Sequence, residues 1–456
     1  MAESSHFISK RTTHGRKEEK PLKYDEVGGG PKKAQSRGKL FNRFRELNDA
    51  QLNHGEVGGR RAKRGSHVPV FDDEEEVDHG QVGDPANVSI NQNWVAGSMS
   101  LVSPKAPTVV LFEGDQTFHS FGYEAENNYS ELALDGEHMD YFFFKRFKMR
   151  LRGKKLLENR RTGVDNKDIH WVLTVPAIWS DAAKQLMREA AQKAGIDGGQ
   201  LSIALEPEAA SMYCQLIPTN KMQGCEGAKF QVALAGTKYM VIDLGGGTAD
   251  IIVYQRMQDG GLKELHTASG GAWGGTTVDD GFYNMIIKII GGPVWSKFKD
   301  KKAGTADYHD LQRELETKKR TITPESTGKI SIKVPVTIVQ TYEKESGETI
   351  DEAIDGSDYN GKIKWFIDKI RIDAKVFQDL FKPCTDKIVA HIKSLFQDPQ
   401  VKDTKIFLMV GGLSESAMVQ NAVKKAFPDC KVIIPDEAGL CILKGAVIFG
   451  HKLVYT

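Results

Sequence analysis

The sequence predicts a mixed α/β protein with two sheets, preceded by an amino-terminal arm. From about residue 107, short β-branched apolar runs alternate with segments whose apolar residues recur at helical spacing. Several of the apolar runs end in clusters of glycine, of which the chain has 45. Residues 1–98 instead carry charged residues and glycine with no sustained apolar period. Such a segment buries too little apolar surface to offset its chain entropy, so we expect the arm to be disordered.

The composition excludes several classes of protein. The chain has 62 Lys and Arg against 61 Asp and Glu, and this balance argues against a dedicated nucleic-acid binder. Five widely spaced cysteines indicate neither a disulfide framework nor a zinc knuckle. No secretory leader and no apolar run of ~18 residues is present, so we expect a cytoplasmic protein without membrane contact. The basic run at residues 60–64 is either a solvated patch or a nuclear address, which leaves nuclear entry open.

The first globular elements are a hairpin and a β–α unit. Thr108–Phe112 and Thr117–Gly122 are extended patterns on either side of a turn at Glu113–Asp115. His170–Val175 is a strand stopped by proline, and a capped helix follows it and ends at Gly195.

The central elements place acidic residues at strand ends. Leu201–Leu205 is a short strand, and a helix begins directly after it at Glu206. Tyr239–Asp243 and Asp250–Tyr254 form a hairpin around a glycine turn. Helical patterns follow at 276–290 and 308–322.

The carboxyl-terminal part repeats the β–α theme. Lys329–Tyr342 alternates apolar and polar residues and is expected to be β-rich, whereas 373–396 is a helix that Pro383 should kink or divide. The remaining expected elements are a strand at 405–410, a helix near 415–427, a strand at 431–434 and a closing helix from Pro435 to about Gly450.

The segment Val241–Ile251 carries the sharpest chemical signal. An apolar strand runs into Gly245, Gly246 and Gly247, then Thr248, then a second apolar strand. Consecutive glycines allow backbone N–H groups to turn toward one anion, which suits a phosphate. Asp243 and Asp250 flank this turn and would offer oxygen to a hydrated Mg²⁺ on a nucleotide. A tight hairpin without any ligand is the structural alternative.

Two further glycine clusters follow the same pattern. Residues 269–277 contain Gly274 and Gly275 just before a helix, and 407–414 form an apolar strand that ends in Gly411 and Gly412. Paired glycines at a strand end allow a base or ribose to approach the backbone. Three such sites in one α/β chain suggest one nucleotide held in a cleft between two domains.

These motifs resemble the 70 kDa heat-shock protein family of the actin-like ATPase superfamily. VIDLGGGTADI is similar to the second phosphate motif of that family, FLMVGGLSES to its adenosine motif, and LTVPAIWSDAAKQLMREAAQKAGI and IPDEAGLCILKGAVIFG to its connecting regions. EPEAAS, VGGLSES and FHSFGY resemble the divergent branch of heat shock 70 kDa proteins 12A and 12B. The match covers about residues 105–456. It implies a two-lobed ribonuclease H-like fold whose first lobe is incomplete.

The resemblance implies a role for each matching residue. ATP or ADP and Mg²⁺ would be the ligands, and protein clients or co-chaperones of a stress-response chaperone would be the partners. Glu206 would orient the attacking water, Asp243 would order water on Mg²⁺ together with Asp250, and Lys148, or less favourably Lys145, would be the catalytic lysine. The implied nucleotide contacts are Gly245, Gly246, Gly247, Thr248, Gly274, Gly275, Glu316, Lys319, Arg320, Gly411, Gly412 and Asp436. A solvated helix face is the alternative for the three residues at 316–320.

Departures from the family pattern weaken the prediction of hydrolysis. The first phosphate motif, a strand ending in Asp, Phe or another apolar residue, then Gly-Thr-Thr, is absent, so one edge of the first sheet is expected to lack a partner. Glu415 stands where typical members have an arginine that stacks on adenine. We therefore expect an ATP-binding protein with at most weak ATPase activity and without a standard peptide-binding domain.

Three alternatives to this function remain open. They are a pseudo-ATPase that acts as a regulator or scaffold, a gene product truncated before the first motif, and a sugar or acetate kinase on the same fold. The expected domains are an arm at 1–98, the rest of the first lobe at 99–235, the second lobe at 236–430, and a closing strand and helix at 431–456.

Overall fold

The computed structural model describes residues 27–28, 94–96, 101–103, 105–145, 169–225, 234–302 and 306–455. The predicted disorder of residues 1–98 falls almost wholly outside this set. At two points the arm forms strands: β1 (Val27–Gly28) pairs with β6 (Phe142–Lys145), and β2 (Trp94–Ala96) pairs with β3 (Leu101–Ser103). The sequence predicted that one edge of the first sheet lacks a partner strand, whereas the two-residue β1 pairs with part of β6 at one edge.

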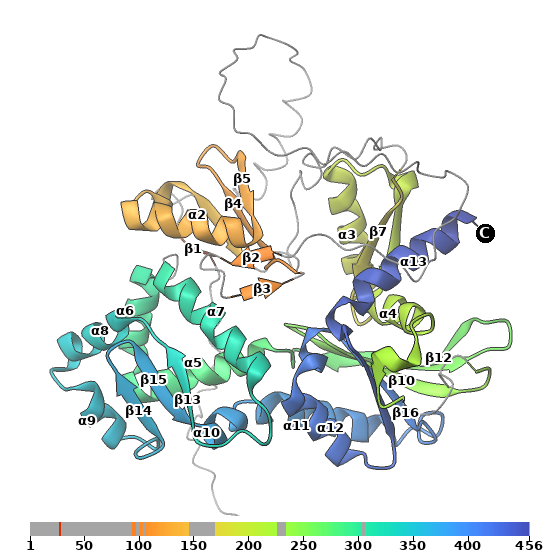
Figure 1. Ribbon diagram of the computed structural model, residues 1–456. Coiled ribbons are helices and arrows are strands. Elements are labelled where there is room, and N and C mark those ends of the chain that lie inside the picture. The colour runs from red at the N-terminus through yellow and green to blue at the C-terminus, as the bar shows by residue number, and fades with distance from the viewer. Residues whose placement is uncertain are drawn as a thin grey trace, which may run out of the picture.

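The first lobe, our name for the part built on β4 to β8, begins with the predicted hairpin. β4 (Val109–Phe112) pairs with β5 (Phe118–Phe121), and the sheet order is β1-β6-β4-β5. Helix α2 (Gly122–Asp135) covers this sheet (Figure 1), where Tyr129 stacks on Phe143 at 4.2 Å. Both rings are buried, so this small apolar core fixes α2 on the sheet.

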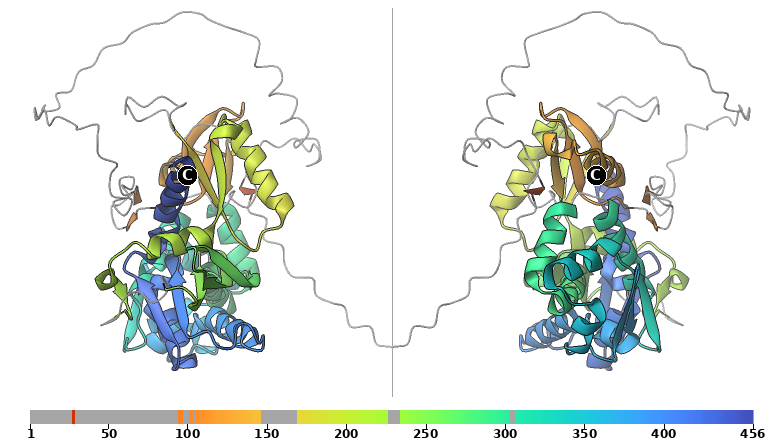
Figure 2. Two further views of the ribbon diagram at one scale, coloured as in Figure 1. Left: turned by 90° about the vertical axis from the view of Figure 1, so that its right-hand side faces the viewer. Right: turned by 90° about the vertical axis from the view of Figure 1, so that its left-hand side faces the viewer.

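The second half of the first lobe is the predicted β–α unit. β7 (Trp171–Val175) pairs in parallel with β8 (Leu201–Leu205) through α3 (Asp181–Lys193), which Ser180 caps. α4 (Glu206–Cys214) starts where β8 ends. The last helix, α13 (Cys441–Tyr455), returns to pack against α4 and β7 (Figures 1 and 2). It starts at Cys441 rather than at Pro435, because residues 431–435 complete a strand.

The second lobe is built on a six-stranded sheet with the order β12-β11-β10-β16-β17-β9. β10 and β11 form the predicted hairpin, while β10, β16 and β17 run in parallel. The parallel strands are buried along their length, as expected of strands covered on both faces. The strands are β9 (Met222–Gln223), β10 (Lys238–Leu244), β11 (Ala249–Arg256), β12 (Leu262–Gly271), β16 (Ile406–Val410) and β17 (Lys431–Pro435).

Most helices of the second lobe follow the prediction. Proline 383 lies in the first turn of a helix and divides the expected 373–396 helix in two. The matching helices are α5 (Thr276–Ile290), α7 (Ala306–Thr321), α10 (Ala374–Asp379), α11 (Lys382–Leu395) and α12 (Ala417–Ala426).

Two predictions for this lobe need correction. α6 (Gly292–Lys302) was not predicted, and the expected β-rich stretch 329–342 is a strand, β13 (Lys329–Lys333), followed by helix α8 (Val336–Ser346). Pro335 precedes α8 and is compatible with a helix start but not with a continued central strand. β13 joins β14 (Ile363–Phe366) and β15 (Lys369–Asp373) in a separate antiparallel sheet, with α9 (Ile350–Asp355) beside it.

Candidate functional site

Three carboxylates from two lobes meet at one point. Glu206 begins α4 of the first lobe, whereas Asp243 and Asp250 lie opposite each other as register partners in the β10–β11 hairpin of the second lobe. Ligand oxygens of the three side chains all lie within 4.8 Å of one another. The residues are 9%, 3% and 1% exposed, respectively. The hairpin and the β8–α4 junction therefore build an acidic cluster that the sequence separates by 44 residues (250 − 206).

The surroundings of Asp250 in this acidic cluster favour its protonated form. Burial, and next the negative charge of Glu206, raise its pKa from 3.8 to about 6, and a hydrogen bond from Thr248 opposes this. Thr248 Oγ1 donates to Asp250 Oδ2 at 3.3 Å, while Oδ1 is buried and has no hydrogen-bond partner among the described residues. Oxygen ligands suit a hard divalent cation such as Mg²⁺, which would relieve the repulsion and take up the free oxygen.

The predicted glycine turn lies beside the acidic cluster. Gly245 N donates to Thr248 O at 2.9 Å and closes the turn between β10 and β11. A Cβ added to Gly246 or Gly247 would have no neighbour within 4 Å, so this side of the turn is open. An open backbone turn next to a cation site is suited to a phosphate.

The second glycine cluster packs directly on this turn. Gly275 N donates to Gly245 O at 3.2 Å and Thr276 N donates to Gly246 O at 2.8 Å. A Cβ on Gly274 would lie 2.6 Å from Gly246 O, so a larger residue cannot fit there without movement. The two motifs that the sequence separates thus form one surface.

The third cluster reaches the same place because β16 lies beside β10. Gly411 follows β16 with a φ of +86°, which favours glycine. A Cβ on Gly411 would lie 2.5 Å from Asp243 Oδ1, whereas Gly412 is open. The structure therefore brings together the three glycine clusters that the sequence predicted to share one ligand.

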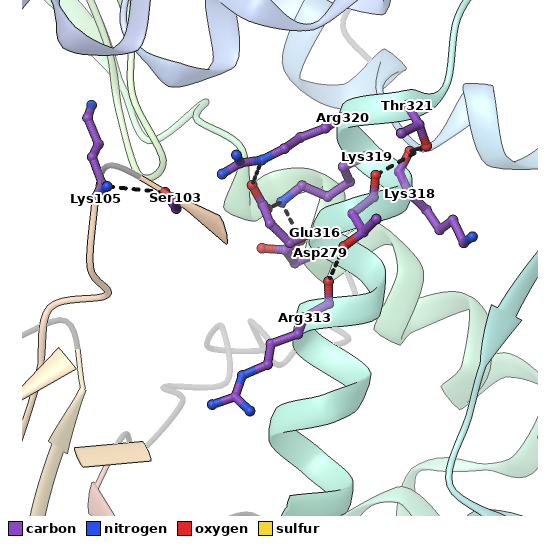
Figure 3. Close-up of polar contacts among 10 residues, drawn as sticks. Ser103, Lys105, Asp279, Arg313, Glu316, Lys318, Lys319, Arg320 and Thr321 are labelled. Atoms are coloured by element: carbon purple, nitrogen blue, oxygen red, sulfur yellow. Dashed lines mark hydrogen bonds and ion pairs between the residues drawn. The ribbon is translucent and has the colours of Figure 1, made fainter. Parts of the chain in front are cut away.

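Helix α7 contributes a charged group to one side of this surface (Figure 3). Lys319 is 8% exposed, and its Nζ lies 2.7 Å from both Asp279 Oδ1 and Glu316 Oε2. Arg320 Nε lies 2.9 Å from the other oxygen of Glu316. A Cβ on Gly275 would be 3.8 Å from Lys319 Nζ, so this group adjoins the second glycine cluster. The alternative of a solvated helix face is wrong for Lys319.

The ion-pair partners in this α7 group keep Lys319 and Glu316 in their charged forms. Burial disfavours the charged form of Lys319, but Asp279 and Glu316 outweigh it and raise the pKa of the ammonium. Burial likewise acts against the carboxylate of Glu316, yet Lys319 and Arg320 lower its pKa. The role of Asp279 as partner of Lys319 was not predicted from the sequence.

Comparison with known proteins assigns the family. The sequence pattern of the family described as "Hsp70 protein" matches residues 154–454, more than half of the chain. The chain belongs to the Hsp70 family. Its sheets and helices form a mixed α/β architecture, as the sequence predicted.

Two heat shock 70 kDa proteins are similar to this chain over most of its length. The chain is 33% identical over 450 residues to heat shock 70 kDa protein 12A of Mus musculus, with 80% of this chain and 66% of that protein covered. It is 32% identical over 453 residues to heat shock 70 kDa protein 12B of Homo sapiens, with 81% and 66% covered. The chain thus spans just under two thirds of the length of these relatives.

Two solved structures resemble the fold of this Hsp70-family chain. MreB5 of Spiroplasma citri bound to ADP covers 78% of this chain and 92% of its own, at a TM-score of 0.47 and 13% identity. The same protein bound to AMPPNP covers 80% and 95%, at a TM-score of 0.49 and 13% identity. None of the helices among the described residues is long and apolar enough to cross a membrane.

The remaining predicted residues lie at different places in this Hsp70-family chain. Lys148 is outside the described residues, and Lys145 contacts Gln312 at 3.1 Å. Asp436 is exposed at the end of β17, where its N–H donates to Lys221 O at 3.0 Å. Glu415 Oε1 accepts a hydrogen bond from Gly439 N at 2.8 Å, so it ties the third glycine cluster to the last connecting region.

Proposed function

We propose that this Hsp70-family chain binds ATP or ADP with Mg²⁺ between its lobes. The observation that carries the proposal is the meeting of three glycine clusters beside the buried acidic cluster of Glu206, Asp243 and Asp250. The turn at residues 245–247 is open where a phosphate would lie, and the free oxygen of Asp250 is available to a cation or its water.

Each part of the site has a role in this proposal. The backbone N–H groups of Gly246 and Gly247 would hold phosphates, on a turn that the Gly245–Thr248 hydrogen bond closes, and Gly274 and Gly275 would contact ribose and phosphate. Gly411 and Gly412 would allow the nucleoside to approach β16, and Asp436 would lie near it. Glu316, Lys319 and Arg320 would flank the adenosine, with Arg320, half exposed, free to stack on the purine. Mg²⁺ would neutralise phosphate charge when bound.

We propose at most weak hydrolysis of the bound ATP. Glu206 is placed beside the two aspartates and could orient a water molecule for attack on a phosphorus atom. The first phosphate motif, which would supply a further carboxylate and a second phosphate-binding turn, is absent from the sequence. The same absence supports the second candidate function, a pseudo-ATPase that binds nucleotide as a regulator or scaffold.

Isothermal titration calorimetry tests nucleotide binding. ATP and ADP are titrated into the full chain with Mg²⁺ or with EDTA. Gly246→Val should abolish binding, because its side chain would enter the open phosphate position, where an added Cβ meets no protein atom within 4 Å. Gly292→Val is the matched control, since Gly292 is also open and lies outside the site. Binding that Gly246→Val leaves unchanged would contradict the proposed position of the phosphates.

A single-turnover assay separates a weak ATPase from a pseudo-ATPase. Radiolabelled ATP is mixed with excess protein, and phosphate release is followed for the wild-type chain and for Glu206→Ala. A weak ATPase predicts release that is measurably faster in the wild-type chain. Equal rates in the two proteins would support the pseudo-ATPase.

A further inference from the structure

The two lobes also touch through a second set of side chains, at a contact between α2 and β6 of the first lobe and α7 of the second. Arg313 Nη2 on α7 lies 3.2 Å from Glu126 Oε2 and 2.8 Å from Asn127 Oδ1 on α2. Lys145 Nζ at the end of β6 donates to Gln312 Oε1 at 3.1 Å. Figure 1 shows α7 directly below α2 and its sheet. Polar bonds between residues more than 160 positions apart hold the lobes together here.

His309 lies at the centre of this interlobe contact. It is 1% exposed, and its Nδ1 is 2.8 Å from Ser130 Oγ on α2. Ser130 Oγ donates its single hydrogen to Glu126 O at 2.7 Å, so it must accept from His309, which fixes the proton of the neutral ring on Nδ1. His309 Nε2 is then an acceptor, and within the described part of the chain it is buried without a partner.

The surroundings of His309 disfavour a second proton. Burial, and then the positive charges of Lys145 on β6 and Arg313 on α7, lower its pKa well below the ordinary 6.5, against a smaller opposing effect of the Glu126 backbone from α2. The ring also contacts the aromatic rings of Phe143 and Tyr308, with centroid distances of 5.8 and 6.3 Å. Glu126 is already engaged by Arg313 and, at 4.0 Å, by Lys145. Asp310, the neighbouring carboxylate on α7, pairs with Arg313 at 3.6 Å, so both carboxylates named here among the described residues already face a cation.

The sign of the pH effect follows from these contacts. A proton on Nε2 can be hydrated only if α2 and α7 separate, so the separated form binds protons more readily than the closed form. The stabilisation of the closed form by neutral His309 is fully present above the ordinary histidine pKa of about 6.5, and it is lost as the pH falls below that value. Between pH 7.5 and pH 5.5 this linkage favours separation by about tenfold for one histidine.

We propose that the contact of α2 and β6 with α7 is an acid-sensitive latch between the lobes, with His309 as its proton sensor. Below pH 6.5 the latch opens the side of the cleft on which α7 lies. This inference concerns lobe separation and holds whether or not a nucleotide binds. The site at Glu206, Asp243 and Asp250 shares no residue with the latch.

Pulsed electron paramagnetic resonance measures the separation directly in the nucleotide-free full chain. Spin labels are placed at Leu134→Cys on α2 and Phe366→Cys on β14, two exposed positions in different lobes, in a Cys430→Ser background that removes the most accessible native thiol. The wild-type latch should show a second, longer distance whose ratio to the short one increases about tenfold from pH 7.5 to pH 5.5.

Matched substitutions identify the sensor. His309→Asn keeps an N–H donor for Ser130 but cannot titrate, so its distance distribution should not change with pH. His266→Asn removes a histidine on β12 outside the contact and should behave as wild type. Ser130→Ala removes the oxygen that accepts from His309 Nδ1–H, so the proportion of molecules with the longer distance should be higher already at pH 7.5. This variant keeps the test decisive if His309→Asn fails to fold. A wild-type distance independent of pH, or an acid response that persists in His309→Asn, would overturn the proposal.

Discussion

Gly411 and Asp243 approach so closely that a single added carbon would displace the acidic cluster. A Cβ on Gly411 would lie 2.5 Å from Asp243 Oδ1 and 2.4 Å from Leu244 O, and the φ of +86° at this residue disfavours other amino acids. The third glycine cluster therefore sets the position of the first carboxylate. The sequence predicts that Gly411 contacts the nucleoside, and the structure shows that its small size also leaves room for Asp243.

Gly411→Ala is predicted to destabilise the fold by roughly 1–3 kcal/mol, the usual range for a strained backbone position. Urea unfolding followed by circular dichroism measures the difference. Gly412→Ala is the control, because a Cβ at that position meets no atom within 4 Å. Equal stabilities of the two variants would show that the approach of Gly411 to Asp243 is not constraining.

Asp250→Asn is predicted to stabilise the metal-free protein at pH 7.5. The folded pKa of Asp250, about 6, lies above its ordinary 3.8, so its contribution to stability is present below pH 3.8 and is lost as the pH rises through 6. The shift of about 2 pKa units corresponds to on the order of 2–3 kcal/mol. The gain should shrink between pH 7 and pH 5 in urea unfolding, and a gain that does not change with pH would contradict this assignment.

The same substitution should remove stabilisation by Mg²⁺. In the wild-type chain, added Mg²⁺ should raise the unfolding midpoint at pH 7.5 and have less effect at pH 5.5, where Asp250 is largely protonated. Asp250→Asn should show no effect of Mg²⁺ at either pH. Thermal unfolding with 10 mM-scale additions of Mg²⁺, compared with Asp436→Asn as an exposed carboxylate control, checks this.

Lys319→Met is predicted to destabilise the protein by about 3–5 kcal/mol, because it leaves two partly buried carboxylates without their shared cation. Lys318→Met is the neighbouring control, since Lys318 is 31% exposed in its side chain and pairs with Glu314 at 3.5 Å on the helix surface. Chemical unfolding measures the free energy of unfolding of both variants and of the wild-type chain. A Lys319 variant as stable as the Lys318 variant would refute the buried cluster.

Glu415→Arg is predicted to tighten nucleotide binding several-fold. An arginine at this position can stack on a purine, whereas the carboxylate cannot, and the lost bond to Gly439 N is worth only about 1 kcal/mol. Glu415→Gln keeps an acceptor for Gly439 and removes the charge, so it separates charge from stacking. Titration calorimetry with ADP compares the three proteins, and weaker binding in the arginine variant would argue against a base beside residue 415.

Much of the fold was predictable where local pattern and tertiary packing agree. The hairpin around residues 245–248 and helix α5 follow the predicted bounds because apolar periodicity and glycine punctuation coincide there. Helix α8 was missed because its β-branched residues favour strands locally, while burial of Ile338 and Tyr342 against the core of the second lobe selects the helix. β1 has no sequence signal, since its pairing depends on an edge supplied by residues 142–145.

Some residues of the candidate site could also be predicted from the sequence, and others could not. Asp243, Asp250 and the glycine turns are strand-end residues with a recognisable motif, and the structure places them next to one another at the ends of β10, β11 and β16. The partnership of Lys319 with Asp279, and that of His309 with Ser130, join residues 40 and 179 positions apart. Such pairs depend on how helices dock, so a single sequence carries no local pattern for them.

The most direct test of the central claim is a crystal structure of the chain grown with Mg²⁺ and a non-hydrolysable ATP analogue. The proposal predicts phosphate density against the backbone of Gly245–Gly247 and a cation bound, directly or through water, by Asp243 and Asp250. The base should lie between α7 and Gly411–Gly412. An analogue bound elsewhere, or a site without density in crystals grown at saturating nucleotide, would contradict the account.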